Sequence, residues 1–243
     1  MLSFELLIFI FSGFIHGLLG FGFPMIATPL LSVFLSIKEA VLLTLFPTLV
    51  LNGQVARQGG NFTAIWQEYK VLILSVIVGS FIGTNFLIKF DSEYYKLILA
   101  FVMLLYLNKE KLNLSLEKII INNSIVTMAI FGLISGIVSG LVNVMLPILV
   151  IYILESKIEK EKSIILMNFC FFSSKLTQIF IFGSTGNFSF NFLLYMIPVV
   201  IISLVGLFLG TKIRKKIDEN LYTKILRILL WILSIYLIIQ VFF

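Results

Sequence analysis

One lysine in an apolar stretch has the residue type and the neighbours of an anion-binding group. Lys175 lies in SIILMNFCFFSSKLTQIFIF, with Asn168 seven residues before it and Gln178 three residues after it. This spacing places the three side chains on one helical face, and Ser174 adjoins them. A charged side chain inside a bilayer costs about 3 kcal/mol or more, and a bound anion would offset that cost. The alternative is that the helix ends at Phe172 and that the lysine reaches the membrane interface.

Two longer apolar segments are interrupted near their middle. The first contains GFGFP at residues 20–24 and the second contains GLVN at residues 140–143, and each has a further proline beyond the interruption. An interrupted helix exposes unpaired N–H groups and the positive end of its dipole, which attract anions. The residues whose backbone we expect to face such a site are Gly22, Phe23, Asn143 and Val144.

Two more polar residues are candidates for contacts with a ligand. His16, the only histidine, precedes the first interruption, and it is either a hydrogen-bonded interior group or a contact for the substrate or a proton. Asn52 follows Thr44 and Thr48 at four-residue spacing, and we expect the threonines to pack and the asparagine to contact a ligand. Amides such as Asn52 and Asn143 would then hold the oxygens of the substrate.

The remaining reactive side chains do not suggest an enzyme. The chain has one histidine and one cysteine, Cys170, and no carboxylate is predicted within the hydrocarbon. We therefore find no nucleophile–base pair and no metal cluster, and we predict no catalytic residue, no cofactor and no metal. Cations favour acidic cages, whereas this sequence offers a lysine, amides, hydroxyls and helix ends, so an anion is the favoured substrate.

The composition shows what kind of elements must position these residues. Of the 243 residues, 60% are hydrophobic and 12% are charged, and the mean hydropathy is +1.11. A water-soluble fold carries about 25% charged residues. The chain is therefore expected to be an integral membrane protein in contact with the lipid bilayer. The net charge of +6 is spread over the loops, which argues against nucleic-acid binding.

Eight apolar segments are long enough to form membrane helices. They are, approximately, residues 3–35, 40–56, 70–89, 93–107, 123–154, 163–182, 190–211 and 221–243. A helix needs about 20 residues to span a hydrocarbon core. The two interrupted segments, 3–35 and 123–154, are too long for one crossing, so we expect broken or hairpin-like helices there.

The two halves of the chain repeat each other. GSFIGTNFLIKFDSEYYKLIL (79–99) matches GLFLGTKIRKKIDENLYTKIL (206–226), with nine identical residues at a constant offset. Internal duplication is typical of secondary transporters. The predicted fold is an all-α polytopic membrane protein with two homologous four-segment repeats, at 1–110 and 124–243, joined by 111–123 into one membrane domain. The glycines within the repeats are expected to allow close helix packing.

The charges of the loops favour inverted repeats. If each interrupted segment is a hairpin that enters and leaves the bilayer on the same side, the 18 Lys and Arg residues divide 14 to 4. Eight full crossings, with parallel repeats, would divide the same residues 12 to 6. The positive-inside rule prefers the first arrangement and places both termini outside. Parallel repeats remain the alternative.

With these residues in view, the chain resembles the TauE/SafE family of sulfite and organosulfonate permeases. The resemblance covers nearly the whole sequence and depends on GFIHGLLGFGFPMIATPLL (13–31) and GLISGIVSGLVNVMLPILV (132–150). It implies transport of a small sulfur oxyanion across a bacterial inner membrane. Family members commonly have glycines where this chain has Phe21, Phe23 and residues 141–144, so the specific substrate does not follow from the resemblance.

The resulting hypothesis is a secondary transporter for sulfite or an organosulfonate, working by alternating access between the two repeats. No ATP-binding motif is present, so a proton, an ion or the substrate gradient would drive it. The alternatives are an anion channel and an accessory membrane subunit, whose polar residues would be scattered rather than convergent. The sequence leaves the coupling ion, the direction and the oligomeric state open.

Overall fold

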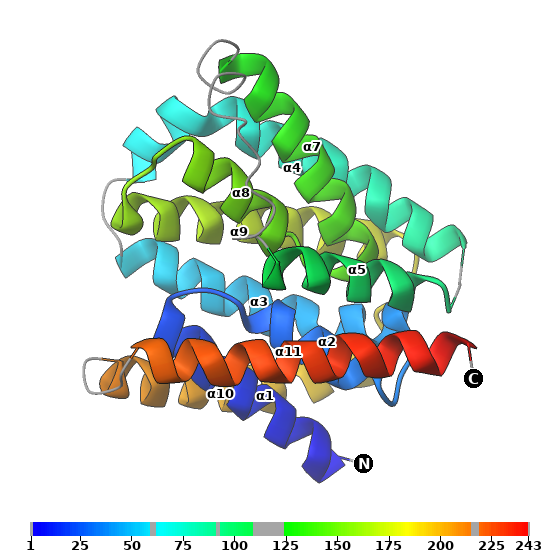
Figure 1. Ribbon diagram of the computed structural model, residues 1–243. Coiled ribbons are helices and arrows are strands. Elements are labelled where there is room, and N and C mark those ends of the chain that lie inside the picture. The colour runs from blue at the N-terminus through cyan, green and yellow to red at the C-terminus, as the bar shows by residue number, and fades with distance from the viewer. Residues whose placement is uncertain (1, 59–61, 91–92, 109–123, 215–218, 243) are drawn as a thin grey trace.

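All regular structure in the computed structural model is helical. It describes residues 2–58, 62–90, 93–108, 124–214 and 219–242, and these residues form ten helices and no strand (Figure 1). The helices are α1 (Leu2–Leu19), α2 (Phe23–Ser32), α3 (Ile37–Gln58), α4 (Phe62–Lys89), α5 (Tyr95–Leu107), α7 (Ser124–Val142), α8 (Leu146–Glu155), α9 (Lys160–Ser184), α10 (Phe190–Ile213) and α11 (Glu219–Phe242). The all-α prediction is confirmed. The connection predicted at 111–123 lies outside the described residues.

The helices have the length and composition of membrane helices. Within the described residues, α3, α4, α7, α9 and α10 are long and apolar enough to cross a bilayer, and α2, α5, α8 and the stretches Phe4–Leu19 of α1 and Leu230–Phe242 of α11 are shorter but also apolar. Each interrupted segment forms two helices, α1 with α2 and α7 with α8. The chain is an integral membrane protein with broken first segments.

Short polar sequences fix where several helices begin. Ahead of α3, the backbone N–H of Ser36 donates to Glu39 Oε2 at 3.0 Å, and the N–H of Glu39 donates to Ser36 Oγ at 3.2 Å. This reciprocal pair is a capping box. Ser189 caps α10 by accepting from the N–H of Phe192. The caps satisfy N–H groups that have no partner within the helix.

One helix extends further than the sequence suggests. The predicted segment 70–89 corresponds to α4, which begins at Phe62 and therefore includes Glu68. The carboxylate of Glu68, with its side chain 48% exposed, accepts from Lys162 Nζ at 2.5 Å and joins the start of α4 to the start of α9. Glu68 thus belongs to α4 but lies ahead of the predicted apolar segment 70–89.

Glycines bring two pairs of helices into backbone contact. A Cβ added to Gly136 of α7 would collide with the carbonyl oxygen of Val76 in α4, and one added to Gly17 of α1 would collide with that of Leu207 in α10. Such small residues allow membrane helices to approach closely. Because α1 and α4 belong to the first half of the chain and α10 and α7 to the second, both close helix pairs join the two halves.

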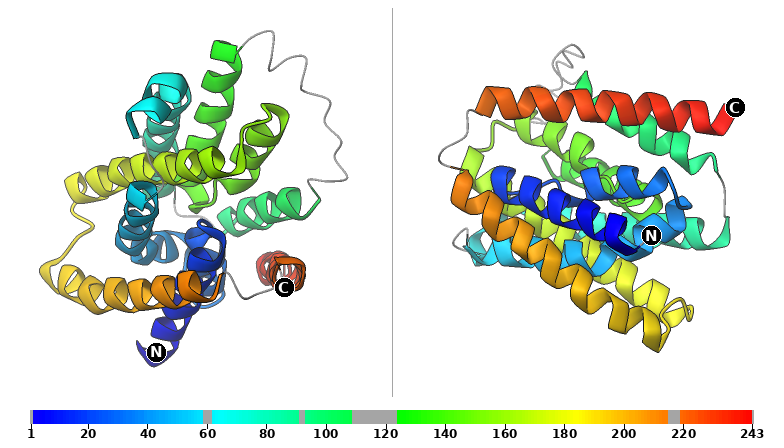
Figure 2. Two further views of the ribbon diagram at one scale, coloured as in Figure 1. Left: turned by 90° about the vertical axis from the view of Figure 1, so that its left-hand side faces the viewer. Right: turned by 90° about the horizontal axis from the view of Figure 1, so that it is seen from below.

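The contacts also fix the directions of the helices. Glu68 faces Lys162, and twelve residues later in both helices Ser80 faces Ser174, so α4 and α9 run parallel. Because α3 reverses into α4 and α9 reverses into α10, α3 runs opposite to α9 and α4 runs opposite to α10. The last helices of the two halves, α5 and α11, pack against each other (Figures 1 and 2).

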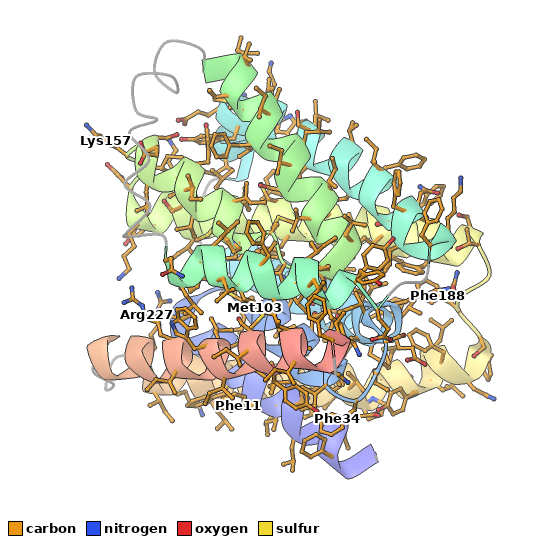
Figure 3. All side chains as sticks on the ribbon, turned by 45° about the vertical axis from the view of Figure 1, so that its right-hand side comes forward. Phe11, Phe34, Met103, Lys157, Phe188 and Arg227 are labelled. Atoms are coloured by element: carbon orange, nitrogen blue, oxygen red, sulfur yellow. The ribbon has the colours of Figure 1, made fainter. Side chains whose placement is uncertain are left out.

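The outer surface of the bundle is apolar along its sides. Phe180 and Phe190 are 74% and 75% exposed. Figure 3 shows Lys157 and Arg227 near one end of the bundle and Phe188 near the other. Exposed aromatic side chains of this kind are compatible with a lipid environment.

Replacement of Gly136 by alanine should destabilise the protein, because the new methyl group would meet backbone atoms of α4 rather than a flexible side chain. Overpacking of this kind costs about 1–3 kcal/mol. The measurement is the thermal unfolding midpoint in detergent. Gly183→Ala is the control, since the nearest side-chain atoms to its added Cβ lie at 3.6 Å. Equal midpoints for both variants would contradict the packing described here.

Candidate functional site

Both helix interruptions depend on residues that adopt a left-handed backbone. Gly20 and Gly22 have φ values of 83° and 102° between α1 and α2. Asn143 has a φ of 64° between α7 and α8. Glycine takes this conformation without a Cβ penalty, and asparagine is among the few other residues that tolerate it. The second interruption therefore forms without glycine.

The first interruption is held by two polar side chains. The N–H of Phe23, at the start of α2, donates to His16 Nδ1 at 3.3 Å. Asn168 of α9 donates from Nδ2 to the carbonyl oxygens of Gly20 and Ile164, both at 2.7 Å. The N–H group of Phe23, which we expected to face a ligand, is therefore already occupied by His16.

The bond from Phe23 determines which nitrogen of His16 carries the proton. A neutral imidazole that accepts at Nδ1 carries its hydrogen at Nε2. His16 is fully buried, and its Nε2 has no partner among the described residues. His16 is thus hydrogen-bonded inside the protein at Nδ1, and its contact with a substrate or a proton through Nε2 stays a prediction.

The second interruption is tied to the opposite half of the chain. Asn143 donates from Nδ2 to Thr28 Oγ1 at 2.9 Å and to Thr44 Oγ1 at 2.6 Å. The hydroxyl of Thr44 donates in turn to the backbone carbonyls of Ala40 and Val41. Residues of α2 and α3 therefore fix the amide of Asn143.

A polar cluster surrounds Lys175 inside the bundle. Its Nζ donates to Gln178 Oε1 at 2.6 Å and lies 3.4 Å from Ser139 Oγ. Gln178 donates from Nε2 to the backbone carbonyl of Ser139 at 2.6 Å. Ser174 lies within hydrogen-bond distance of Ser80 and Ser139, at 2.7 and 2.8 Å. Helices α4, α7 and α9 thus meet at this cluster.

The Lys175 cluster contains no acidic partner. Lys175 is fully buried, and α9 continues to Ser184, which excludes the alternative in which the helix ends at Phe172. None of the buried polar residues in the described part of the chain is an aspartate or a glutamate. Among the described residues, the hydrogen-bond partners of the lysine are the neutral oxygen atoms of Gln178 and Ser139.

The cluster and the second interruption adjoin each other. The N–H of Asn143 donates to the carbonyl oxygen of Ser139 at 2.9 Å, and the same oxygen accepts from Gln178. One turn of α7 therefore links the backbone N–H of Asn143, through Ser139 and Gln178, to Lys175.

The structure brings some of the predicted site residues together and separates others. Asn143, Ser174, Lys175 and Gln178 belong to the linked cluster. His16, Gly22, Phe23 and Asn168 lie at the first interruption. Asn52 donates to Thr48 of its own helix, and Val144 is part of the apolar core.

Two expectations require correction. Asn168 does not share the cluster of Lys175 and Gln178, because α9 passes the first interruption at that position and Asn168 bonds to Gly20. Both N–H groups of the Asn143 amide donate to threonine hydroxyls and are not free to hold the oxygens of a substrate, whereas the Asn52 amide donates one of its two N–H groups to Thr48 and its ligand contact stays a prediction.

Sequence reasoning also missed residues of the site. Thr28, Ser80 and Ser139 are not among the site residues that the sequence predicts. The one available signal was that Ser80 and Ser139 lie among the repeated glycines, where two helices come close. For metals, the described residues contain no group of three or more His, Cys, Asp or Glu side chains that could hold an ion.

Comparison with known proteins places the chain in a family. The sequence model of the family described as sulfite exporter TauE/SafE matches residues 5–237. The chain belongs to this family. No curated protein and no solved structure matches it. TauE/SafE proteins are membrane transporters rather than enzymes, in agreement with the apolar helices.

The match locates the interrupted segments within the family region. Both interruptions, at 20–22 and 143–145, fall inside the residues that the TauE/SafE model covers. At the second interruption, Asn143 supplies both the left-handed turn and two hydrogen bonds.

Replacement of Asn168 by leucine should loosen the first interruption, because the carbonyl of Gly20 would lose its donor. An unsatisfied buried polar group costs about 1–3 kcal/mol. We expect amide hydrogen exchange in residues 16–26 to rise about tenfold or more, measured by mass spectrometry. The control is Asn187→Ala, since the side-chain amide of Asn187 donates to Thr185 within the loop between α9 and α10, away from the first interruption. Unchanged exchange would mean that Asn168 does not hold the break.

Proposed function

We propose that the protein is a secondary transporter that moves a small oxyanion, sulfite or an organosulfonate, across a bacterial inner membrane. The proposal is supported chiefly by Lys175, a fully buried lysine whose partners are the neutral side chains of Gln178 and Ser139. Membership of the TauE/SafE family supports the choice of sulfur oxyanions.

The electrostatics of the buried lysine favour an anionic substrate. An ammonium group inside the membrane costs about 3 kcal/mol or more when nothing balances its charge. Side-chain oxygens reduce this cost but carry no formal charge. A substrate anion would balance the charge of Lys175. The free-energy cost of burying the ammonium group would then fall, and this gain would contribute to the affinity for the anion. A bare cation would instead be repelled.

Convergence of the polar residues favours a transporter over an accessory subunit. Thr28, Thr44, Ser80, Ser139, Asn143 and Lys175 come from five helices and are joined by hydrogen bonds directly or through their neighbours. An accessory subunit has no need for such a buried network, and an unused network of this size would cost stability.

For the mechanism, the two halves act as oppositely oriented repeats that move against each other. The opposite directions of α3 and α9, and of α4 and α10, support this arrangement. Rocking of one bundle against the other would expose the Lys175 cluster to each side in turn. A proton or another ion is the coupling partner if transport proceeds against the gradient of the substrate.

For the topology, the cation-rich ends of the helices face the cytoplasm and both termini face outward. Cysteines placed at Glu93 and Glu159, in a chain with Cys170 replaced by serine, should react from opposite sides of the membrane. We expect a membrane-impermeant maleimide to label residue 93 in intact cells and residue 159 only after permeabilisation. Labelling of both from the same side would favour parallel repeats.

Replacement of Lys175 by methionine should remove anion binding without unfolding the protein. Methionine fills a similar volume, and it removes the desolvation cost of the charge, so the thermal midpoint should stay equal or rise. Affinity for sulfite should fall by at least tenfold, measured by titration calorimetry on purified protein.

The matched control is Lys162→Met, which removes a lysine that is 35% exposed and pairs with Glu68. This variant should keep its affinity for sulfite. If the wild-type protein binds none of sulfite, sulfoacetate and thiosulfate, the proposed substrate class is wrong. If it binds and Lys175→Met binds equally well, the assigned role of Lys175 is wrong.

A further inference from the structure

Three buried asparagines have a carbonyl oxygen without a partner. The Oδ1 atoms of Asn52, Asn143 and Asn168 are buried, and each of these residues is fully enclosed. A buried polar atom without a partner costs about 1–3 kcal/mol. Folded proteins therefore keep few such atoms, and those that remain call for an explanation.

The orientation of each amide follows from its partners. Asn52 and Asn168 donate to backbone carbonyl oxygens, which can only accept. Asn143 donates to Thr44 Oγ1, whose own hydrogen is directed at the carbonyls of Ala40 and Val41. In all three residues the NH₂ group is committed to the protein, and the carbonyl oxygen is the atom left over.

Of the three, Asn143 lies closest in the network to the buried charge. Its N–H and the amide of Gln178 both donate to the carbonyl oxygen of Ser139, and the hydroxyl of Ser139 lies 3.4 Å from Lys175 Nζ. A ligand that reaches both Lys175 Nζ and Asn143 Oδ1 would meet an ammonium group that needs negative charge and an amide oxygen that needs a hydrogen-bond donor.

These two requirements restrict the ligand. We propose that the substrate is a singly charged oxyanion that also carries an O–H or N–H group, such as hydrogensulfite or a hydroxyalkyl or aminoalkyl sulfonate. Its charged oxygens bind Lys175, and its donor binds Asn143 Oδ1. A fully deprotonated dianion without a donor would place its lone pairs against that oxygen. This inference rests on the proposed function and narrows its substrate class.

Two sulfonates of equal charge test the inference. 2-Hydroxyethanesulfonate and ethanesulfonate differ by one hydroxyl group, and both are titrated by calorimetry into the purified full-length protein. We expect the hydroxylated compound to bind about tenfold more tightly or better, because only that compound satisfies the buried acceptor. An apolar site without a free acceptor would prefer ethanesulfonate.

The variant Asn143→Gly assigns the preference to one atom. Glycine keeps the left-handed turn at this position and removes the amide oxygen. The ratio of the two affinities should fall to about one. The control is Asn85→Ala, whose amide donates to Phe81 on the exposed part of α4, and it should retain the wild-type ratio.

The outcomes separate this inference from the proposed function. Equal binding of the two sulfonates by the wild-type protein, or tighter binding of ethanesulfonate, overturns the donor requirement and leaves the transporter proposal intact. A wild-type preference that survives in Asn143→Gly overturns the role of Asn143. Failure to bind either sulfonate or sulfite overturns the proposed function and this inference with it. The wild-type comparison decides the donor requirement even if the glycine variant does not fold.

Discussion

The backbone of an interrupted membrane helix must find hydrogen-bond partners inside the protein, because the bilayer supplies none. In this chain the partners come from across the molecule. Asn168 of the second half donates to Gly20 of the first interruption, and Asn143 of the second interruption donates to Thr28 and Thr44 of the first half. The second half of the chain therefore stabilises the interruption of the first half. The interruption of the second half is in turn anchored to residues of the first half. The same requirement places amide and hydroxyl groups close to the buried lysine.

The course of the helices could be predicted largely from glycine, proline and apolar length. Pro24 and Pro147 suit the first turn of a helix, and the residues before them end α1 and α7 as expected. The start of α4 could not be predicted, since Gln67, Glu68 and Lys70 suggest a loop until Lys162 is known to lie beside them. An ion pair between distant parts of the chain leaves no local signal.

The contacts of the candidate site could be predicted within one helix but not between helices. Lys175 and Gln178 are three residues apart on one helix, so their contact follows from helical geometry. Ser80 and Thr28 are small hydroxyl residues that look like packing residues until the facing helix is known. The sequence also could not predict that the side-chain carbonyl oxygen of each asparagine has no partner. The orientation of each amide depends on acceptor oxygens that other parts of the fold supply.

The close contact between α1 and α10 has a consequence for biosynthesis. Gly13 and Gly17 of α1 meet the backbone of α10 at Ser203 and Leu207, which leave the ribosome about 190 residues later. During insertion, the face of α1 that carries Gly13 and Gly17 therefore contacts lipid until α10 has been synthesised. Packing of α1 against α10 belongs to the last stage of assembly. A chain whose synthesis stops between residues 185 and 189 would hold every described helix up to α9 and still lack α10, against which α1 packs.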